Sequence, residues 1–549
     1  MVTTTTPDSL TALADEYYEY ARAADGHSLL WNSSTEHLET WPVFGPDAVA
    51  EIQRALGEFA ARADALTATT PREIALKDAI AFTARASAVD LTWNAAITGT
   101  HPALGFVAMI EVFATRFNLQ SAEHADQYLT KMRALPATLD DLASVAEAEA
   151  MVGVVGLARH LNRTADMIDA LVASPDALDR IAAQAPPSDL PQAQADAWTG
   201  ELRAIVTNEV LPALTEHANR MRTLADRGRD DDHPGLCHLP GGDVVYRDLV
   251  WAMTSTDLSP EAIHQLGLDQ VERLNEEYVA IAGPLLGTID LQQIYTRLRE
   301  DQSLKYQDSK TLVADAEAAF ERATAALSGA FNRLPVTPCT VNAVKGGAQA
   351  YYSAPEPETG KPGEFFFNVE RPDDWSRTEL EGTTFHEGVP GHHLQFALHE
   401  EDAGLHNVLK RMNVTAYLEG WALYTERLAD ELGLYSGPLQ RIGMLENDSL
   451  RACRLVVDTG MHALGWTRQQ AIDFILANSP NSLGAITAEV DRYIAMPAQA
   501  LSYMVGRLEI LRLRQKARLP LAEFHDRVLA HGMVPLPTLA RLVLDSPHD

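Results

Sequence analysis

The sequence predicts a mainly α-helical fold with one small β-element, and three observations support this. Apolar residues recur every three or four positions through most of the chain, which is typical of amphipathic helices packed on a core. The helix-favouring residues Ala, Leu, Glu and Arg dominate residues 1–230. Residues that favour strands are concentrated in one region, 340–369. We therefore expect a large helical molecule with a small sheet.

Composition and charge exclude several classes of protein. The chain has 549 residues, of which 46% are hydrophobic and 22% charged, with a formal net charge of −32. Such a surplus of negative charge repels phosphate backbones, so nucleic-acid binding is not expected. No apolar run is long enough to span a membrane, and the N-terminal residues lack the basic and apolar segments of a secretory signal, so none is expected. With only three cysteines, the chain is predicted to be cytoplasmic and free of disulfides.

The N-terminal region, residues 1–230, is predicted to be helical almost throughout. Its helices are expected over residues 47–66, 71–89 and 138–159. A loop rich in Pro, Gly and Asp follows at residues 224–242 and marks the best boundary. We expect a second region, 231–549, to contain the functional site and to join the first in one integrated fold.

The β-element is expected directly before the segment with the strongest chemical signal. Its strands are predicted at residues 340–344, 348–353 and 364–369. From these residues alone, an aromatic hairpin that only covers the core is one open interpretation.

Residues 383–396 contain His386-Glu387 followed by His392-His393. A His-Glu pair on a helix, with another His further along, is typical of zinc hydrolases. The imidazoles bind Zn²⁺, and the Glu takes a proton from the attacking water. This pattern predicts a zinc site in which Glu387 is the general base.

The spacing of the histidines differs from the usual i and i+4. On an ideal helix His392 would point about 240° away from the first histidine, and His393 would lie roughly 10 Å along the axis. Gly388, Pro390 and Gly391 allow a bulge or a break that re-aims His392. The residues alone leave open which of the two histidines binds the metal.

A third ligand is expected on a helix predicted over residues 411–433. Glu419 interrupts an apolar run there, and a carboxylate among apolar side chains is costly unless it is paired or binds a metal. Glu426 lies on the same side, as a substitute ligand or as a partner of a ligand imidazole.

The next helix is predicted to place Arg451, Arg454, Asp458 and His462 on one face. This face is either a row of ion pairs or a surface that binds substrate. In the second case His462 donates to an oxyanion or Arg454 binds a carboxylate.

Residues 383–396 resemble a bacterial family of unassigned function whose signature is H-E-G-x-P-G-H-x-x-Q. That family is similar to the helical thermolysin-like zinc metallopeptidases, among them thimet oligopeptidase, neurolysin and the thermostable carboxypeptidases. The resemblance continues through residues 416–424, 457–466 and 497–507. It implies that His392 is the second ligand and Glu419 the third.

The resemblance also implies roles for residues outside the metal site. Tyr503 stands where a tyrosine hydroxyl stabilises the oxyanion, and Arg507 would be its neighbour. An edge strand beside the zinc would pair with extended substrate. The resulting candidates for substrate contacts are Tyr351, Tyr352 and Asn368.

The predicted function is a zinc-dependent hydrolase that cleaves peptide or peptide-like amide bonds. His386, His392 and Glu419 would hold Zn²⁺, and Glu387 would act as base and then as acid to the leaving amine. The alternatives are a zinc amidase of a small metabolite and a catalytically inactive helical metal-binding scaffold. The unusual spacing also leaves iron or manganese open.

Overall fold

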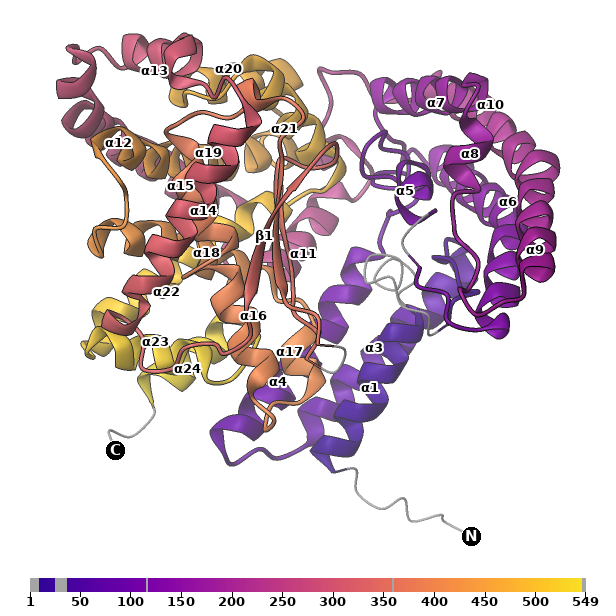
Figure 1. Cartoon of the computed structure of the whole chain (residues 1–549), viewed down its shortest axis with the longest axis horizontal. Coiled ribbons are helices and arrows are strands. Elements are labelled where there is room, and N and C mark those ends of the chain that lie inside the picture. The colour runs from indigo at the N-terminus through magenta and orange to yellow at the C-terminus, as the bar shows by residue number, and fades with distance from the viewer. Residues whose placement is uncertain (1–8, 25–36, 115–116, 358–359, 546–549) are drawn as a thin grey trace.

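The computed structural model describes residues 9–24, 37–114, 117–357 and 360–545. The protein is mainly helical with a small three-stranded sheet, as the sequence predicts. Figure 1 shows α6 to α10 gathered at one end of the molecule and most later helices at the other, with α1, α3 and α4 below.

The first group of helices occupies the chain up to residue 225. It comprises α1 (Leu10–Ala24), α3 (Pro46–Ala65), α4 (Pro71–Asp90), α5 (Phe106–Phe113), α6 (Ala122–Met151), α7 (Ala158–Ala173), α8 (Ala177–Ile181), α9 (Gln192–Ile205) and α10 (Leu211–Ala225). Helix α4 begins at Pro71 because Thr70 and Glu73 form a capping box. The helix predicted over 138–159 is wrong at its end. Helix α6 stops at Met151, and the chain turns at Gly153, whose φ is 89°.

The second group follows the boundary loop and surrounds the sheet. It comprises α11 (Gly242–Thr254), α12 (Pro260–Leu286), α13 (Leu291–Glu300), α14 (Ser309–Ala326), α15 (Glu379–Glu387), α16 (His392–Glu401), α17 (Asn407–Arg411), α18 (Thr415–Glu431), α19 (Pro438–His462), α20 (Arg468–Asn478), α21 (Leu483–Ala495), α22 (Ser502–Ala517), α23 (Leu521–Leu529) and α24 (Leu536–Leu544). Helix α18 begins at Thr415 rather than at residue 411 as predicted. None of the described helices combines the length and apolar character needed to cross a bilayer.

The sheet lies beside the helices that carry the histidines. Its strands are β1 (Cys339–Val344), β2 (Ala350–Ser353) and β3 (Gly363–Asn368), in the order β1-β3-β2. Strand β3 pairs parallel with β1 and antiparallel with β2. Phe365 and Phe367 are buried with Trp375 and with Leu312 of α14, because alternate side chains of a strand point to the same face. Packing on this face leaves β2 in contact with α15 and β3 in contact with α16.

Two apolar cores hold the helices together. One lies within residues 38–225 and joins α5, α6, α7, α9 and α10. The larger one joins α11 and later helices with α1, α3 and α4. The first helices therefore share a core with the second group, although they precede residue 230. The division at residue 230 stays a prediction.

Candidate metal centre

The two motif histidines lie on different helices because the chain breaks between them. His386 is near the end of α15, and His392 is the first residue of α16. Gly388 and Gly391 leave the helical conformation, with ψ of −120° and −128°. A Cβ at Gly391 would lie 1.9 Å from the carbonyl oxygen of His386, so the chain can pass there only without a side chain. The sequence allowed either a bulge or a break of the helix between the two histidines, and the structure has a break.

This break brings His386 and His392 together with Glu419 of α18. Glu419 Oε2 lies 3.6 Å from Nε2 of each histidine, and one ligand atom from each residue lies within 4.8 Å of the others. Ligand atoms at about 2.0–2.1 Å from a tetrahedral zinc ion are about 3.4 Å apart. The residues therefore fit a divalent metal, with two imidazoles and one carboxylate as donors.

A buried carboxylate orients the first histidine. Nδ1 of His386 lies 2.8 Å from Oε1 of Glu426. The Glu426 side chain is fully buried, and its Oε2 accepts a hydrogen bond from Asn447. A proton held on Nδ1 leaves Nε2 as the metal-binding atom. Glu426 is thus placed as an imidazole partner, one of the two roles that the sequence allows. The sequence analysis did not predict Asn447. The pattern that could have indicated it is a polar residue four positions before Arg451, on the same face of the helix.

The electrostatic environment of the cluster favours a positive charge. Burial alone would lower the pKa of His386, but Glu419 and Glu426 raise it to about 9. Burial alone would raise the pKa of Glu419, but His386 and His392 hold it below its ordinary value. A cation at this position, whether a proton or a metal ion, is therefore stabilised by the carboxylates.

The structure separates the roles of the two adjacent histidines. His393 turns towards the sheet, where Nδ1 accepts from the Tyr352 hydroxyl at 2.9 Å and Nε2 donates to the Thr337 carbonyl at 3.2 Å. Burial lowers its pKa to about 4. Since both of its ring nitrogens are used, His392 is the histidine that joins the cluster.

Glu387, the last residue of α15, lies beside the same three residues. Burial raises its pKa, the nearby His386 and His392 oppose this rise, and Glu419 adds to it. A half-buried carboxylate with a raised pKa can accept a proton from water near neutral pH. The position and the pKa both suit the predicted general base.

Tyr503 reaches the cluster through a close crossing of α18 and α22. A Cβ at Gly420 would lie 2.5 Å from Cα of Gly506, so the two backbones touch there. The Tyr503 ring lies 6.5 Å from the His386 ring. Burial and the charge of Glu419 raise the pKa of Tyr503, which keeps its hydroxyl protonated and able to donate.

The sheet places one of the three residues predicted to contact substrate near the cluster. Tyr352 lies with its ring 6.5 Å from that of His392. Tyr351 points to the opposite face and stacks on Phe366 at 4.8 Å. Asn368 accepts from the backbone of Glu370 and closes the turn after β3. The structure therefore does not bring Tyr351 or Asn368 to the cluster.

The predicted roles of His462 and Arg507 are also corrected. His462 is fully buried; its Nδ1 accepts from the Leu236 backbone, and its Nε2 donates to the Tyr493 carbonyl. No ring nitrogen is left for an oxyanion. Arg507 is buried and pairs with Asp448, which ties α22 to α19. Both residues hold helices together, a role that tertiary contacts determine.

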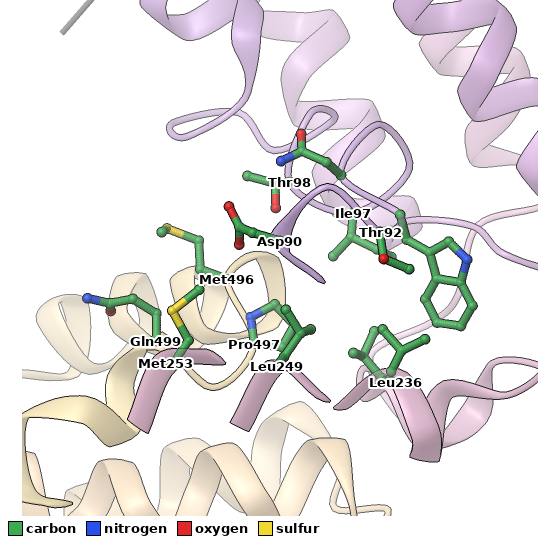
Figure 2. A pocket seen from close by; sticks show the side chains of 13 residues that line it. Asp90, Thr92, Ile97, Thr98, Leu236, Leu249, Met253, Met496, Pro497 and Gln499 are labelled. Carbon is green, nitrogen blue, oxygen red and sulfur yellow. The ribbon is translucent and has the colours of Figure 1, made fainter. Parts of the chain in front are cut away.

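A separate cavity of about 70 Å³ lies between the two groups of helices (Figure 2). It is lined by side chains from the segment 90–98, by Leu236, by side chains of α11 and by others from the segment 496–499, and its lining is mostly apolar. None of the predicted site residues lines it. The metal cluster remains the candidate site.

A comparison with known protein families identifies the family of this chain. Residues 33–543 match the model of a family described as "Bacterial protein of unknown function (DUF885)". The chain belongs to this family. DUF885 therefore replaces the family that the sequence analysis predicted, and its description carries no metallopeptidase activity.

Solved structures resemble this DUF885 protein over nearly its whole length. One is "the putative lipoprotein from Colwellia psychrerythraea", with 25% identity, a TM-score of 0.88, and coverage of 98% of this chain and 99% of the other. Another is "a putative lipoprotein of unknown function from Shewanella oneidensis", with 17% identity, a TM-score of 0.74, and coverage of 98% and 100%. No curated protein matches the chain.

These findings correct the predicted resemblance to thermolysin-like metallopeptidases. Neither the DUF885 description nor the descriptions of the two solved relatives names a peptidase. Any function must therefore be argued from the geometry of the site itself.

Proposed function

We propose that this DUF885 protein is a zinc-dependent hydrolase of peptide or peptide-like amide bonds. The observation that carries the proposal is the cluster of His386, His392 and Glu419, whose ligand atoms lie within 4.8 Å of one another. Two imidazoles and a carboxylate, with a fourth position left for water, are typical of catalytic rather than structural zinc.

Each nearby residue has a defined task in such a reaction. Bound zinc would supply a Lewis acid that activates water and polarises the amide carbonyl. Glu387 accepts the proton from the attacking water and later delivers it to the leaving amine. The Tyr503 hydroxyl donates to the oxygen on which negative charge develops. Glu426 keeps His386 in the required orientation.

The alternatives rank below this proposal for stated reasons. Structural zinc sites usually have four ligands and are rich in cysteine, whereas Cys237, Cys339 and Cys453 lie outside the cluster. This disfavours an inactive scaffold. An amidase of a small metabolite would use the same residues, and substrate tests separate it from a peptidase. Iron or manganese would be revealed by metal analysis.

The cellular location of this protein is also proposed. The sequence predicts a cytoplasmic protein, whereas both solved relatives are described as putative lipoproteins. We propose that this chain lies outside the cytosol, which the description of these relatives as putative lipoproteins favours. Fractionation of the native host tests this, and recovery of the protein in the cytosol would contradict it.

The function is tested by metal analysis of the purified protein together with a digest of a peptide library. We expect about one zinc per chain and cleaved peptides. Zinc with turnover of small amides only would favour the amidase. Zinc without any turnover would contradict the proposed hydrolase.

A further inference from the structure

Three arginines surround Tyr503, beside the metal cluster. The guanidinium carbons of Arg451 and Arg454, one turn apart on α19, lie 5.7 Å and 4.7 Å from the centre of its ring. Arg492 of α21 also acts electrostatically on Tyr503. Positive charge is thus concentrated next to a predicted catalytic hydroxyl in a strongly acidic chain.

The direct ion pairs leave this positive charge only partly compensated. Glu489 pairs with Arg454 at 2.7 Å and with Arg492 at 3.0 Å, so one carboxylate serves two arginines. Arg451 donates to Asn447 Oδ1 at 3.1 Å and has no carboxylate oxygen within 4.0 Å in the described part of the chain. Glu379 and Glu387 act on Arg451 electrostatically without a direct ion pair. A bound anion would therefore add a direct partner for this arginine.

Unpaired donors mark where that anion would bind. Arg454 is only 6% exposed, and its buried Nη1 has no hydrogen-bond partner among the described residues. The buried Nε of Arg451 likewise has none. Buried donors in proteins are normally paired, so unpaired ones indicate a ligand or ordered water. A guanidinium has the geometry to bind a carboxylate through two hydrogen bonds.

We propose that Arg451 and Arg454 bind a carboxylate of the substrate, an inference that rests on the proposed hydrolase function. The substrate is a peptide or N-acyl amino acid whose carboxylate follows the scissile amide closely. Tyr503 lies 6.5 Å from the His386 ring and 4.7 Å from the Arg454 guanidinium. One residue spans about 3.3–3.6 Å, so the carboxylate lies one or two residues beyond the bond that is cleaved. It comes from the chain terminus or from an Asp or Glu side chain.

The kinetic test uses three peptides of one sequence with the zinc-loaded protein. One has a free C-terminus, one is amidated, and one is amidated with Glu as the last residue. We expect kcat/KM for the free acid to exceed that of the plain amide by about 10- to 100-fold, as expected for hydrogen bonds to a charged group. The proposal would be overturned if kcat/KM were equal for the free acid and the plain amide and no higher for the amide that ends in Glu. A fast acidic amide would identify a side chain as the source of the carboxylate.

Variants assign the effect to these arginines. Arg451→Gln should reduce the ratio of acid to amide to near one, and Arg451→Lys should retain part of it because the charge remains. Arg454→Gln should act in the same direction, but its buried ion pair makes Arg451 the safer site for substitution. Arg441→Gln is the matched control, since Arg441 lies on the same helix and pairs at the surface with Asp430. An unchanged ratio in Arg451→Gln would contradict the assignment.

A binding measurement separates this inference from the proposed hydrolysis. By calorimetry, the Glu387→Gln protein should bind a free-acid dipeptide about 10- to 100-fold more tightly than its amide. Adding Arg451→Gln to this protein should remove the difference in affinity. If the wild type hydrolyses no peptide yet this preference is present, the hydrolase proposal fails and the carboxylate site stands. If peptides are cleaved but the free acid is not preferred over the amide, the hydrolase proposal stands and the carboxylate site fails. Absence of any preferential binding would overturn the carboxylate site.

Discussion

At the scale of single residues, the two adjacent histidines make the sharpest distinction. His392 faces Glu419, whereas the ring nitrogens of His393 contact Tyr352 of β2 and the Thr337 carbonyl, which precedes β1. We expect His392→Ala to lose most bound zinc and His393→Ala to keep it, as measured by elemental analysis of both proteins. The opposite result would show that the second ligand is His393.

Glu387 is expected to act in the chemical step rather than in metal retention. Glu387→Gln keeps the size of the side chain but removes the base, so kcat should fall by about 10²–10⁴-fold. Zinc content and melting temperature should stay near those of the wild type. Glu523→Gln, at a half-buried position on α23 that pairs with Arg527 and lies outside the cluster, serves as the control. Parallel loss of zinc and activity would place Glu387 among the ligands.

Tyr503 is predicted to stabilise the oxyanion through one hydrogen bond. Tyr503→Phe keeps the ring that packs near His386 and removes only the hydroxyl. Because the bond is needed mainly in the transition state, kcat should fall by about 10²–10³-fold with little change in KM. A kcat within about threefold of wild type would remove Tyr503 from the mechanism, given the size of the usual effect. His462, which the sequence offers as the next donor, is excluded by its two backbone contacts.

At the scale of elements, the break between α15 and α16 is what brings the histidines together. Gly391→Ala would force a Cβ to within 1.9 Å of the His386 carbonyl oxygen. Such overpacking costs about 1–3 kcal/mol, so we expect a lower melting temperature together with weaker zinc binding. Both are measurable on one sample by thermal unfolding with and without zinc.

A second glycine provides the matched comparison. Gly57 lies inside α3, and apart from its chain neighbours and the adjacent backbone of that helix no atom lies within 4 Å of the position that a Cβ would take there. Gly57→Ala should leave zinc binding unchanged and stabilise the helix by about 0.5–1 kcal/mol. If Gly391→Ala behaved like Gly57→Ala, the local conformation of the break would not determine the position of His392.

At the scale of the whole molecule, zinc binding should be coupled to stability and to pH. The pKa of His386 rises from 6.5 to about 9 in the metal-free fold. This group therefore stabilises the metal-free protein fully below pH 6.5, and the contribution is lost as the pH rises through about 9. Zinc must displace the proton on Nε2, so its affinity should increase over the same interval.

The expected result is a zinc-dependent rise in melting temperature that grows from pH 6.5 towards pH 9. Thermal unfolding with saturating zinc or with a chelator measures this difference at each pH. His386→Ala should abolish the zinc-dependent rise at every pH, because it removes a ligand as well as the titrating group. A shift of the same size at every pH would contradict the predicted proton displacement.

Local sequence was sufficient to predict the helical fold class, the small sheet and the interrupted His-Glu motif. Helix periodicity depends on neighbouring residues, and strand-favouring side chains occur together in one region. Gly388, Pro390 and Gly391 likewise make an interruption of the helix predictable, because their backbone preferences are intrinsic. A carboxylate in an apolar helix was enough to make Glu419 a candidate ligand, with Glu426 left open as a substitute.

Which side chains meet depends instead on long-range packing. Tyr352 and Thr337 turn His393 away from the cluster, and the loop at Leu236 occupies His462. Each of these contacts joins residues far apart in the chain, so no local pattern could predict them. The order of residues specifies which chemical groups are present and where the helices are interrupted. The packed fold specifies which ring nitrogens remain free, because a nitrogen that pairs with a distant backbone group cannot also bind a metal or an oxyanion.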